Sequence, residues 1–388
     1  MKPAKHTQPS CAGQDAREHD EERAYSVADE PERVSQHRLT ARVHQSIVAA
    51  LLLLALAPSG AQAFSKAIWG PVYQNGVSQF PLYQKLGVKI VEMDLNWSTV
   101  APTRPHNSAN PNDPAYLWPA EVQQALAQAK TFGMQVLLQI IGAPRWSNGG
   151  HAWNWAPRPG AFATFAGAAA RHYRTVHLWM IWGEPNRRPN FQPESPAQPG
   201  RLLNHAQQVA PHNYAGILDA AYGALKRVNR HNLVIGGATY TTGDIDTEQW
   251  IQNLRLPNGH PPRMDVYAHN PFTWRVPAFS NTPSPDGEVM FPDLKRLGGW
   301  IDRYLHRGLP IFMSEFTIPT AVDQEFDFYV DPPTQATWIT DALRAARRWK
   351  RIYALGWIHV YDNPPASSGG LMTADGSPKP GFYAFEHG

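Results

Sequence analysis

Residues 179–186 read WMIWGEPN, an apolar run that ends in a glutamate followed by proline. A second run of the same kind, PIFMSEF at 310–316, carries another glutamate later in the chain. Apolar runs of this length, bounded by helix breakers, are typical of strands that are covered on both faces. Each run therefore predicts a buried strand whose last residue is a glutamate, Glu184 in the first and Glu315 in the second.

Six further strand-like runs alternate with segments whose apolar residues recur at helical spacing. Strands that alternate with helices pair in parallel through right-handed crossovers, and eight such units favour a single (β/α)8 TIM barrel over residues 64–388. A doubly wound sheet is the alternative, but it is expected to carry a glycine-rich phosphate turn after an early strand, and Gly369-Gly370 comes too late. The expected strands are 67–70, 88–95, 135–141, 177–183, 233–238, 264–268, 310–314 and 352–358, and the clearest helices are 119–132, 161–173, 212–228, 293–307 and 334–349.

The longest connections follow strands rather than helices. They span 102–117, 186–209, 270–291 and 316–333, and they are rich in Pro, Asn and Ser. In a barrel these loops gather at the carboxyl face, where catalytic groups are placed. Strands four and seven lie on opposite sides of that face, so Glu184 and Glu315 are expected to face each other. Two carboxyl groups about 5–5.5 Å apart are what retaining glycoside hydrolysis requires, whereas surface salt bridges are the plainer alternative for either residue alone.

The residues around both glutamates resemble glycoside hydrolase clan A. WGEPN at 182–186 looks like the Asn-Glu-Pro motif that ends strand four in that clan, and Ser314-Glu315 resembles its strand-seven nucleophile. GAPRW at 142–146 and GLMTADGSPKP at 370–380 are similar to segments of family 39-like and family 5-like members. The resemblance implies a retaining glycosidase that acts on an oligo- or polysaccharide, with Glu184 as general acid/base, Glu315 as nucleophile, and no cofactor.

One position departs from that pattern. The clan usually has Asn where Gly183 stands, and there it hydrogen-bonds the sugar 2-hydroxyl, a contact that can supply several kcal/mol in the transition state. Another residue replaces it, or the substrate is unusual at that position, or activity is reduced. Asn186 is a candidate substitute, and a turn cap is the alternative. A non-catalytic carbohydrate-binding barrel is the alternative function, although binding alone needs no pair of glutamates.

Five other residues are candidates for the sugar-binding site. His269 and Asn270 follow strand six, near where the resemblance places a group that orients the nucleophile, and a structural histidine is the alternative. Trp357 ends strand eight, where clan members commonly stack a sugar ring. Trp97 and Trp146 follow strands two and three. For these tryptophans, core packing or the fastening of loops is the alternative.

The composition excludes several classes of function. The chain has 388 residues, of which 43% are hydrophobic and 17% charged, and its formal charge of +3 without a Lys/Arg run gives no reason to expect a nucleic-acid partner. Its 16 histidines show no HExxH spacing, so we expect no metal. The single cysteine, Cys11, precedes the barrel, which excludes disulfides, thiolate zinc sites and a cysteine nucleophile in 64–388.

Residues 1–63 differ from the rest of the chain. A polar leader is followed by Arg38 and Arg42, an apolar run at 47–57, helix breakers, and Ala61-Gln62-Ala63. A basic region, a short apolar region and an A-x-A site predict a secretory signal that is cut after Ala63, and hence a secreted or periplasmic protein. The apolar run is too short for a permanent bilayer span, so we expect no stable membrane insertion. An uncleaved anchor and a buried helix are the alternatives.

Overall fold

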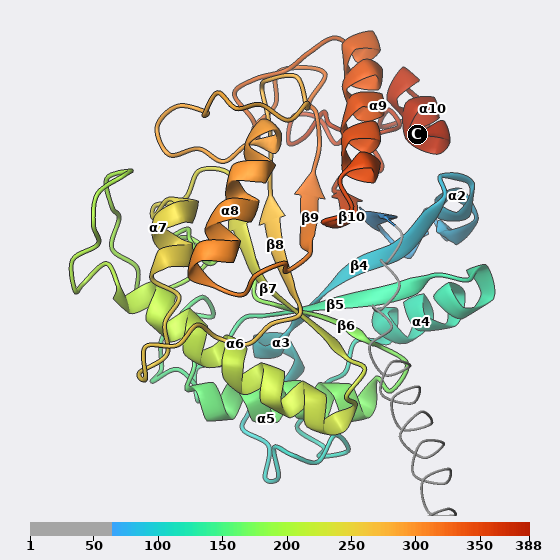
Figure 1. Cartoon of the computed structure of the whole chain (residues 1–388). Coiled ribbons are helices and arrows are strands. Elements are labelled where there is room, and N and C mark those ends of the chain that lie inside the picture. Colours follow the sequence, from blue (N-terminus) through green and yellow to red (C-terminus); the bar gives the residue numbers. More distant parts are fainter. Residues whose placement is uncertain (1–63) are drawn as a thin grey trace, which may run out of the picture. The chain divides into compact units, whose positions relative to one another are not determined.

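A closed barrel of eight parallel strands forms the centre of the fold in the computed structural model, which describes residues 64–388 (Figure 1). The expected leader and signal, 1–63, lie outside the described residues. Around the barrel the strands follow the order β1-β10-β9-β8-β7-β6-β5-β4, which confirms the (β/α)8 TIM barrel. The strands are β1 (Ser65–Trp69), β4 (Val88–Asn96), β5 (Gln135–Ile141), β6 (Leu178–Ile181), β7 (Leu233–Tyr240), β8 (Val266–Asn270), β9 (Ile311–Phe316) and β10 (Ile352–Trp357).

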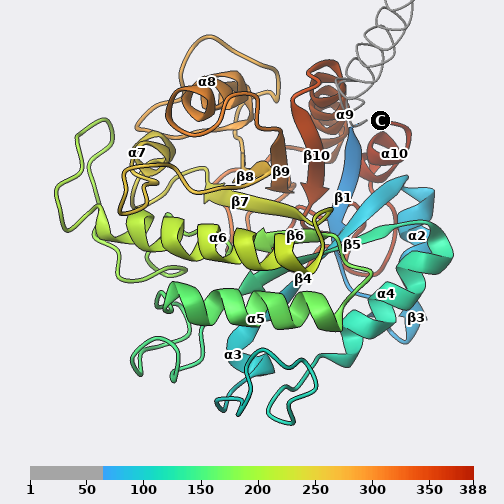
Figure 2. The ribbon, with the colours of Figure 1, turned by 60° about the horizontal axis from the view of Figure 1, so that its bottom comes forward.

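Helices surround the barrel on its outside, and α5 and α6 lie side by side (Figures 1 and 2). A two-stranded ribbon, β2 (Tyr73–Gln74) with β3 (Val77–Ser78), follows the first barrel strand. No helix of the described part of the chain is long and apolar enough to cross a bilayer. The helices are α2 (Phe80–Lys85), α3 (Trp97–Val100), α4 (Ala120–Phe132), α5 (Pro159–His172), α6 (Val209–Val228), α7 (Thr247–Gln252), the 3-10 helix η1 (Phe291–Asp293), α8 (Leu294–Tyr304), α9 (Pro332–Arg348) and α10 (Pro380–His387).

Two apolar layers explain why the strands read as unbroken apolar runs. In β6, Leu178 and Met180 belong to the cluster inside the barrel, whereas Trp179 and Ile181 belong to the cluster between strands and helices. Successive side chains of a strand point to opposite faces, so a strand that is covered on both faces needs apolar residues throughout. All four residues of β6 are buried.

Several strand ends differ from the prediction by one or two residues, and two of these differences concern the glutamates. β6 ends at Ile181, two residues before the expected end, because Trp182 adopts a left-handed φ of 64° and leaves the sheet. Glu184 therefore stands on the turn after the strand rather than at its last position. β9 instead continues through Glu315 to Phe316. The two carboxyl groups thus reach the barrel mouth from different backbone conformations.

Candidate active site

Glu184 is carried by a strained turn at the carboxyl end of β6. Trp182 and Glu184 have positive φ angles of 64° and 45°, and Ala238 on the neighbouring β7 has 47°. Such conformations cost on the order of 1–3 kcal/mol each and cluster at functional sites. The amide of Glu184 donates to the carbonyl of Ala238 over 2.9 Å, and the β7–β8 register shifts at that residue. The two strained strand ends therefore support each other and fix the direction of the Glu184 side chain.

Three nitrogen donors hold the carboxyl group of Glu184, a residue that is only 8% exposed. Arg187 Nη1 and Asn190 Nδ2 donate to Oε2 over 2.6 and 2.9 Å, and Asn270 Nδ2 donates to Oε1 over 3.0 Å. Hydrogen bonds and a positive charge directed at a carboxylate favour its ionised form. Donors on both carboxyl oxygens therefore hold the Glu184 side chain in one orientation.

Asn270, at the end of β8, connects the two glutamates. Ser314 Oγ donates to Asn270 Oδ1 over 2.7 Å, so the amide nitrogen points away from Ser314 and toward Glu184. The same side chain also acts on Glu315, whose pKa it lowers. Because β7 and β8 stand between β6 and β9 in the barrel, this amide lies between the two carboxyl groups. The sequence predicted Asn270 as a site residue, whereas the orienting hydroxyl of Ser314 was missed.

Glu315 lies in the most acidic part of the barrel mouth. Burial is the largest cause that raises its pKa well above the ordinary range, followed by the negative charges of Glu184, Asp94 and Glu325. The hydrogen bond from Asn270 opposes this shift. Burial also raises the pKa of Asp94 to about 6. Protonation of Glu315 is therefore favoured by its surroundings, which is opposite to the simplest expectation for a nucleophile.

A third carboxyl group, Glu92, lies inside the barrel on β4 and is 1% exposed. Neither of its oxygens has a hydrogen-bond partner within residues 64–388. Burial, then the charges of Glu315 and Asp94, raise its pKa well above the ordinary range, which favours the neutral form of this group. The position was missed in the sequence. The signal was available, because Glu92 and Asp94 are two residues apart in a strand and therefore share its inner face.

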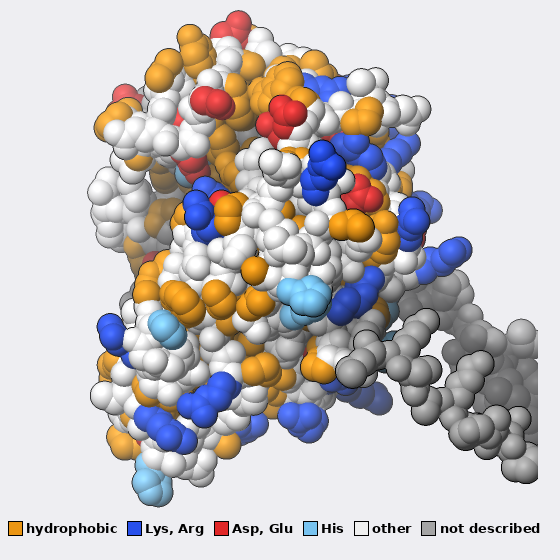
Figure 3. Space-filling model, turned by 90° about the vertical axis from the view of Figure 1, so that its left-hand side faces the viewer, with side chains coloured by type: hydrophobic (Ala, Val, Ile, Leu, Met, Phe, Trp, Pro, Cys, Tyr) orange, Lys and Arg blue, Asp and Glu red, His pale blue; other side chains and the backbone are white. Residues whose placement is uncertain are grey.

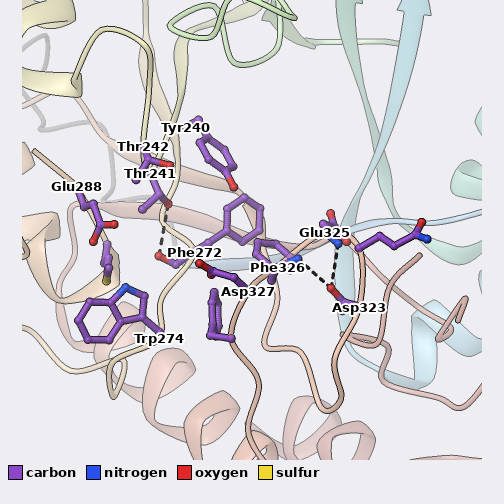
Figure 4. A pocket seen from close by; sticks show the side chains of 13 residues that line it. Tyr240, Thr241, Thr242, Phe272, Trp274, Glu288, Asp323, Glu325, Phe326 and Asp327 are labelled. Atoms are coloured by element: carbon purple, nitrogen blue, oxygen red, sulfur yellow. Dashed lines mark hydrogen bonds between the residues drawn. The ribbon is translucent and has the colours of Figure 1, made fainter. Parts of the chain in front are cut away.

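A cleft of about 780 Å³ lies beside Tyr240 (Figure 4), and neither Glu184 nor Glu315 is among the residues that line it. Tyr240 connects the cleft with Glu184, because it lines the cleft and its ring lies under the Arg187 guanidinium, 4.1 Å away. The Asp and Glu side chains visible in Figure 3 lie mainly in the upper half of that view. Of the described residues that line the cleft, none is Lys or Arg. They are Tyr240, Thr241, Thr242, Phe272, Trp274, Glu288, Met290, Asp323, Gln324, Glu325, Phe326, Asp327 and Phe328.

Asn186 and His269 are structural residues, contrary to the expectation that they bind substrate. Asn186 is fully buried: Oδ1 accepts from the amide of Tyr240 over 2.9 Å and Nδ2 donates to the carbonyl of Ile245 over 3.2 Å, so it ties the β6 loop to β7. His269 is also fully buried between Thr239 Oγ1 and the Val289 carbonyl, and burial lowers its pKa to about 4. Neither side chain reaches the cleft.

Two of the three candidate tryptophans pack in the core, which contradicts their expected contact with sugar. Trp97 is 1% exposed and stacks on Phe165 at 5.1 Å. Trp357 is also 1% exposed and packs against Phe385 of α10, on the outside of the barrel. Trp146 is half-buried and lines a separate depression of about 400 Å³ rather than the cleft beside Tyr240. Its contact with sugar stays a prediction.

Gly183 is a glycine because a neighbouring side chain fills the space beside it. A Cβ atom at position 183 would lie 2.8 Å from Oε1 of Gln139, a β5 residue, and 3.3 Å from its Nε2. Gln139 Nε2 has no hydrogen-bond partner in the described part of the chain. An amide from β5 thus fills the space that a side chain at position 183 would enter.

The site offers carboxyl, amide and guanidinium groups but no recognisable metal centre. Within residues 64–388, no group of three or more His, Cys, Asp or Glu side chains is arranged to hold a metal ion. The chemistry that these residues can perform directly is proton transfer and attack by a carboxylate, since both need only a pair of carboxyl groups in different surroundings.

Comparison with solved structures supports the resemblance that the motifs suggested. The chain matches a family 39 glycoside hydrolase from Bacteroides cellulosilyticus WH2 with a TM-score of 0.60 and 17% identity, over 84% of this chain and 63% of that one. A monomeric β-xylosidase from Caulobacter crescentus CB15 matches with a TM-score of 0.58 and 16% identity, over 84% of this chain and 69% of that one. A glucosidase from Croceicoccus marinus matches with a TM-score of 0.58 and 15% identity, over 84% of this chain and 65% of that one. The similarity to family 39 is therefore confirmed at the level of the fold.

Comparison of the sequence alone gives no relative. No family model and no curated protein matches the chain. The chain spans slightly less than two thirds of the Bacteroides enzyme, 63% of its length. Activity and substrate therefore have to be argued from the residues at the barrel mouth.

Proposed function

We propose that this protein is a retaining glycoside hydrolase in which Glu184 is the general acid/base and Glu315 the nucleophile. The observation that carries this proposal is the position of Asn270 at the carboxyl face of the barrel, where its amide donates to Glu184 over 3.0 Å and its side chain also lowers the pKa of Glu315. A pair of carboxyl groups held this closely, beside a cleft, is the arrangement that glycoside hydrolysis uses. The separation of the two groups is expected to be about 5–5.5 Å, as in retaining enzymes.

The reaction proceeds in two displacements. A carboxylate oxygen of Glu315 attacks the anomeric carbon while Glu184 gives its proton to the departing glycosidic oxygen. Water then attacks the same carbon, Glu184 takes a proton from that water, and the bond between the sugar and Glu315 breaks. The pair needs one proton at the start, and it must reside on Glu184. Because the two groups interact, they titrate as a unit, and the proton that burial favours on Glu315 has to pass to Glu184.

The cleft supports a saccharide without anionic groups as substrate. Tyr240 and Phe272, with ring centroids 5.5 Å apart, and the 46% exposed Trp274 offer aromatic surface for the apolar face of a sugar ring. Figure 4 shows Glu288 beside Trp274 and Glu325 on the opposite side of the cleft. With these carboxyl groups and no lining Lys or Arg among the described residues, a uronate or sulfated sugar meets like charge.

Variants of the two glutamates test the mechanism. Glu315→Ala should abolish turnover of aryl glycosides, and azide should restore it with inverted stereochemistry, because the anion then attacks in place of the missing nucleophile. Glu184→Ala should slow substrates with poor leaving groups far more than activated aryl glycosides, since only the former need the proton. Glu248→Ala, on α7 and outside the cleft, serves as the matched control.

A non-catalytic carbohydrate-binding barrel is the second candidate, and the Arg187–Glu184 ion pair favours it. That contact, 2.6 Å long, occupies an oxygen that an acid/base needs. Binding of oligosaccharides by a protein that turns over no member of a polysaccharide and aryl-glycoside panel would support this candidate. Full activity of both glutamate variants on a confirmed substrate would contradict the catalytic assignment altogether.

We also propose that the protein is secreted or periplasmic. The support is the basic, apolar and A-x-A order of residues 38–63. Sequencing the N-terminus of exported material should give Phe64 as the first residue, and a start well before it would contradict the proposal.

A further inference from the structure

We infer that Arg187 is a positioning residue that holds Glu184 as a carboxylate and thereby sets the pH range over which Glu184 can donate a proton. The inference rests on the proposed function. It concerns a residue that neither the sequence motifs nor the fold assigns to the reaction.

The Arg187 side chain is 35% exposed, yet both an ion pair and an aromatic ring hold its guanidinium. Its Nη1 lies 2.6 Å from Glu184 Oε2, and its guanidinium stacks on the ring of Tyr240 at 4.1 Å. The pKa of Arg187 is raised: burial lowers it, but the charge and hydrogen bond of Glu184 outweigh burial. Stacking on one side and an ion pair at the tip leave the guanidinium little freedom.

The same turn that carries Glu184 also fixes Arg187. The backbone amide of Arg187 donates to the carbonyl of Glu184 over 3.2 Å, so the three-residue spacing places both side chains on one side of the turn. The next residue, Arg188, points elsewhere and pairs with Asp244 at 3.0 Å. Arg187 and Arg188 are adjacent and carry the same charge, but only Arg187 contacts Glu184. Arg188 is therefore a matched control for Arg187.

The charges around Glu184 oppose one another. The negative charges of Asp244 and Glu325 act on its neighbours, Asp244 on Arg187 and Glu325 on Glu315 and Tyr240. Glu315 from β9 adds negative potential at Glu184 itself. This potential favours a proton on Glu184. In the described part of the chain, Arg187 is the cation that forms an ion pair with Glu184, and it favours the ionised form. Arg187 therefore decides which tendency prevails.

A general acid and a general base need opposite states of the same carboxyl group. Holding Glu184 ionised helps the second displacement, in which it accepts a proton from water, and hinders the first, in which it gives one. Arg187 thus lowers the fraction of Glu184 that can protonate the leaving group and raises the fraction that is ionised and can act as a base. A side chain with a merely structural role would affect both displacements in the same direction.

The test compares Arg187→Met with Arg188→Met in pH profiles of kcat/KM and kcat. In Arg187→Met, the alkaline limb for a glycoside with a poor leaving group should move up by about one pH unit or more, because an adjacent Arg shifts a carboxyl group by that amount. For an activated aryl glycoside, kcat should fall, since the second displacement limits it. Arg188→Met should leave both profiles in place, and Arg187→Lys should restore the original limb in part.

An unchanged alkaline limb in Arg187→Met, or an equal loss for both substrates, would overturn the inference and leave the proposed function intact. If the wild-type protein hydrolyses nothing, the proposed function fails, and the inference is then tested by titrating ¹³C-labelled glutamate carboxyl groups by NMR. Glu184 should ionise at lower pH in the wild type than in Arg187→Met. Identical titration in the two proteins would overturn it.

Discussion

At the scale of single residues, the glycine before Glu184 is explained by Gln139. We expect Gly183→Asn to destabilise the fold, because its Cβ would stand 2.8 Å from the Gln139 Oε1 in a packed barrel interior. Overpacking of this kind costs about 1–3 kcal/mol. Gln139→Ala combined with Gly183→Asn should recover most of that loss, and thermal unfolding of the three variants measures it. Additive losses in the double variant would show that the two side chains do not compete for space.

The same variants also test whether the amide of Gln139, beside Gly183, contacts the sugar. If Gln139 supplies the contact, Gln139→Ala should lower kcat/KM about tenfold or more for a glycoside that carries a 2-hydroxyl, and much less for its 2-deoxy analogue. The double variant should regain part of the difference, since it returns an amide to the same space.

The residue scale is also where sequence reasoning was least reliable. Glu184, Glu315 and Asn270 were predicted because all three stand at or just after the end of an apolar run, where a barrel brings side chains together, and their roles stay predictions. Trp357 was assigned to the sugar site wrongly because side chains of a strand alternate between faces, and a shift of one position turns a side chain away from the mouth. Trp97 was assigned wrongly because it begins α3, where it stacks on Phe165 in the core. Nothing in the sequence says on which side of β10 the indole of Trp357 stands. Arg187 and Ser314 were missed because their roles depend on contacts between strands.

At the scale of secondary-structure elements, the strands and the long helices were predictable and their ends were not. Each of the eight expected strands exists, because an apolar run between breakers reports burial on two faces. The end of β6 was wrong by two residues because the left-handed φ of Trp182 leaves no mark in the sequence. α7, with six residues, was missed because so short a helix shows no period, although Asp246 and Gln249 form a capping box at its start.

The loops after β8 and β9 give a prediction about substrate charge. Glu288 and Asp327 line the cleft from these loops. We expect hydrolysis of an unsubstituted oligosaccharide to exceed that of its uronate-bearing counterpart by about tenfold at low salt, and the ratio should shrink as salt screens the cleft. The substitutions Glu288→Gln and Asp327→Asn together should narrow the ratio. Asp341→Asn on α9, paired with Arg344 away from the cleft, is the control. A preference for uronates, or a ratio that salt does not change, would contradict the prediction.

At the scale of the whole molecule, the fold is better established than the chemistry it supports. Alternating strands and helices suffice to predict a barrel, and the solved structures share it at identities of 15–17%. A barrel fold hosts many reactions, so the reaction depends on a few groups at its mouth. Buried carboxyl groups are another property of the whole molecule, because their ionisation is linked to the stability of the entire fold.

Glu194 gives the clearest stability prediction of this kind. It is 8% exposed, and neither of its carboxyl oxygens has a hydrogen-bond partner within residues 64–388. Burial, and then the negative charge of Asp244, raise its pKa to about 9, whereas the positive charge of Arg188 opposes this shift. In the unfolded chain a glutamate ionises near pH 4.3. Between these values the folded protein holds a proton that the unfolded chain has released. The free energy of unfolding must therefore fall as pH rises, by at most about 1.4 kcal/mol per pH unit from this group.

Replacing Glu194 by Gln removes that proton difference and keeps the shape of the side chain. The free energy of unfolding of Glu194→Gln should thus exceed that of the wild type by a margin that grows from about pH 5 to pH 9 and then stays constant. Urea unfolding at one-unit pH steps measures the margin, and Glu121→Gln, at an exposed position on α4, controls for the loss of a charge. Parallel curves for wild type and Glu194→Gln would mean that Glu194 is already ionised in the folded protein, so that Arg188 rather than burial dominates its surroundings.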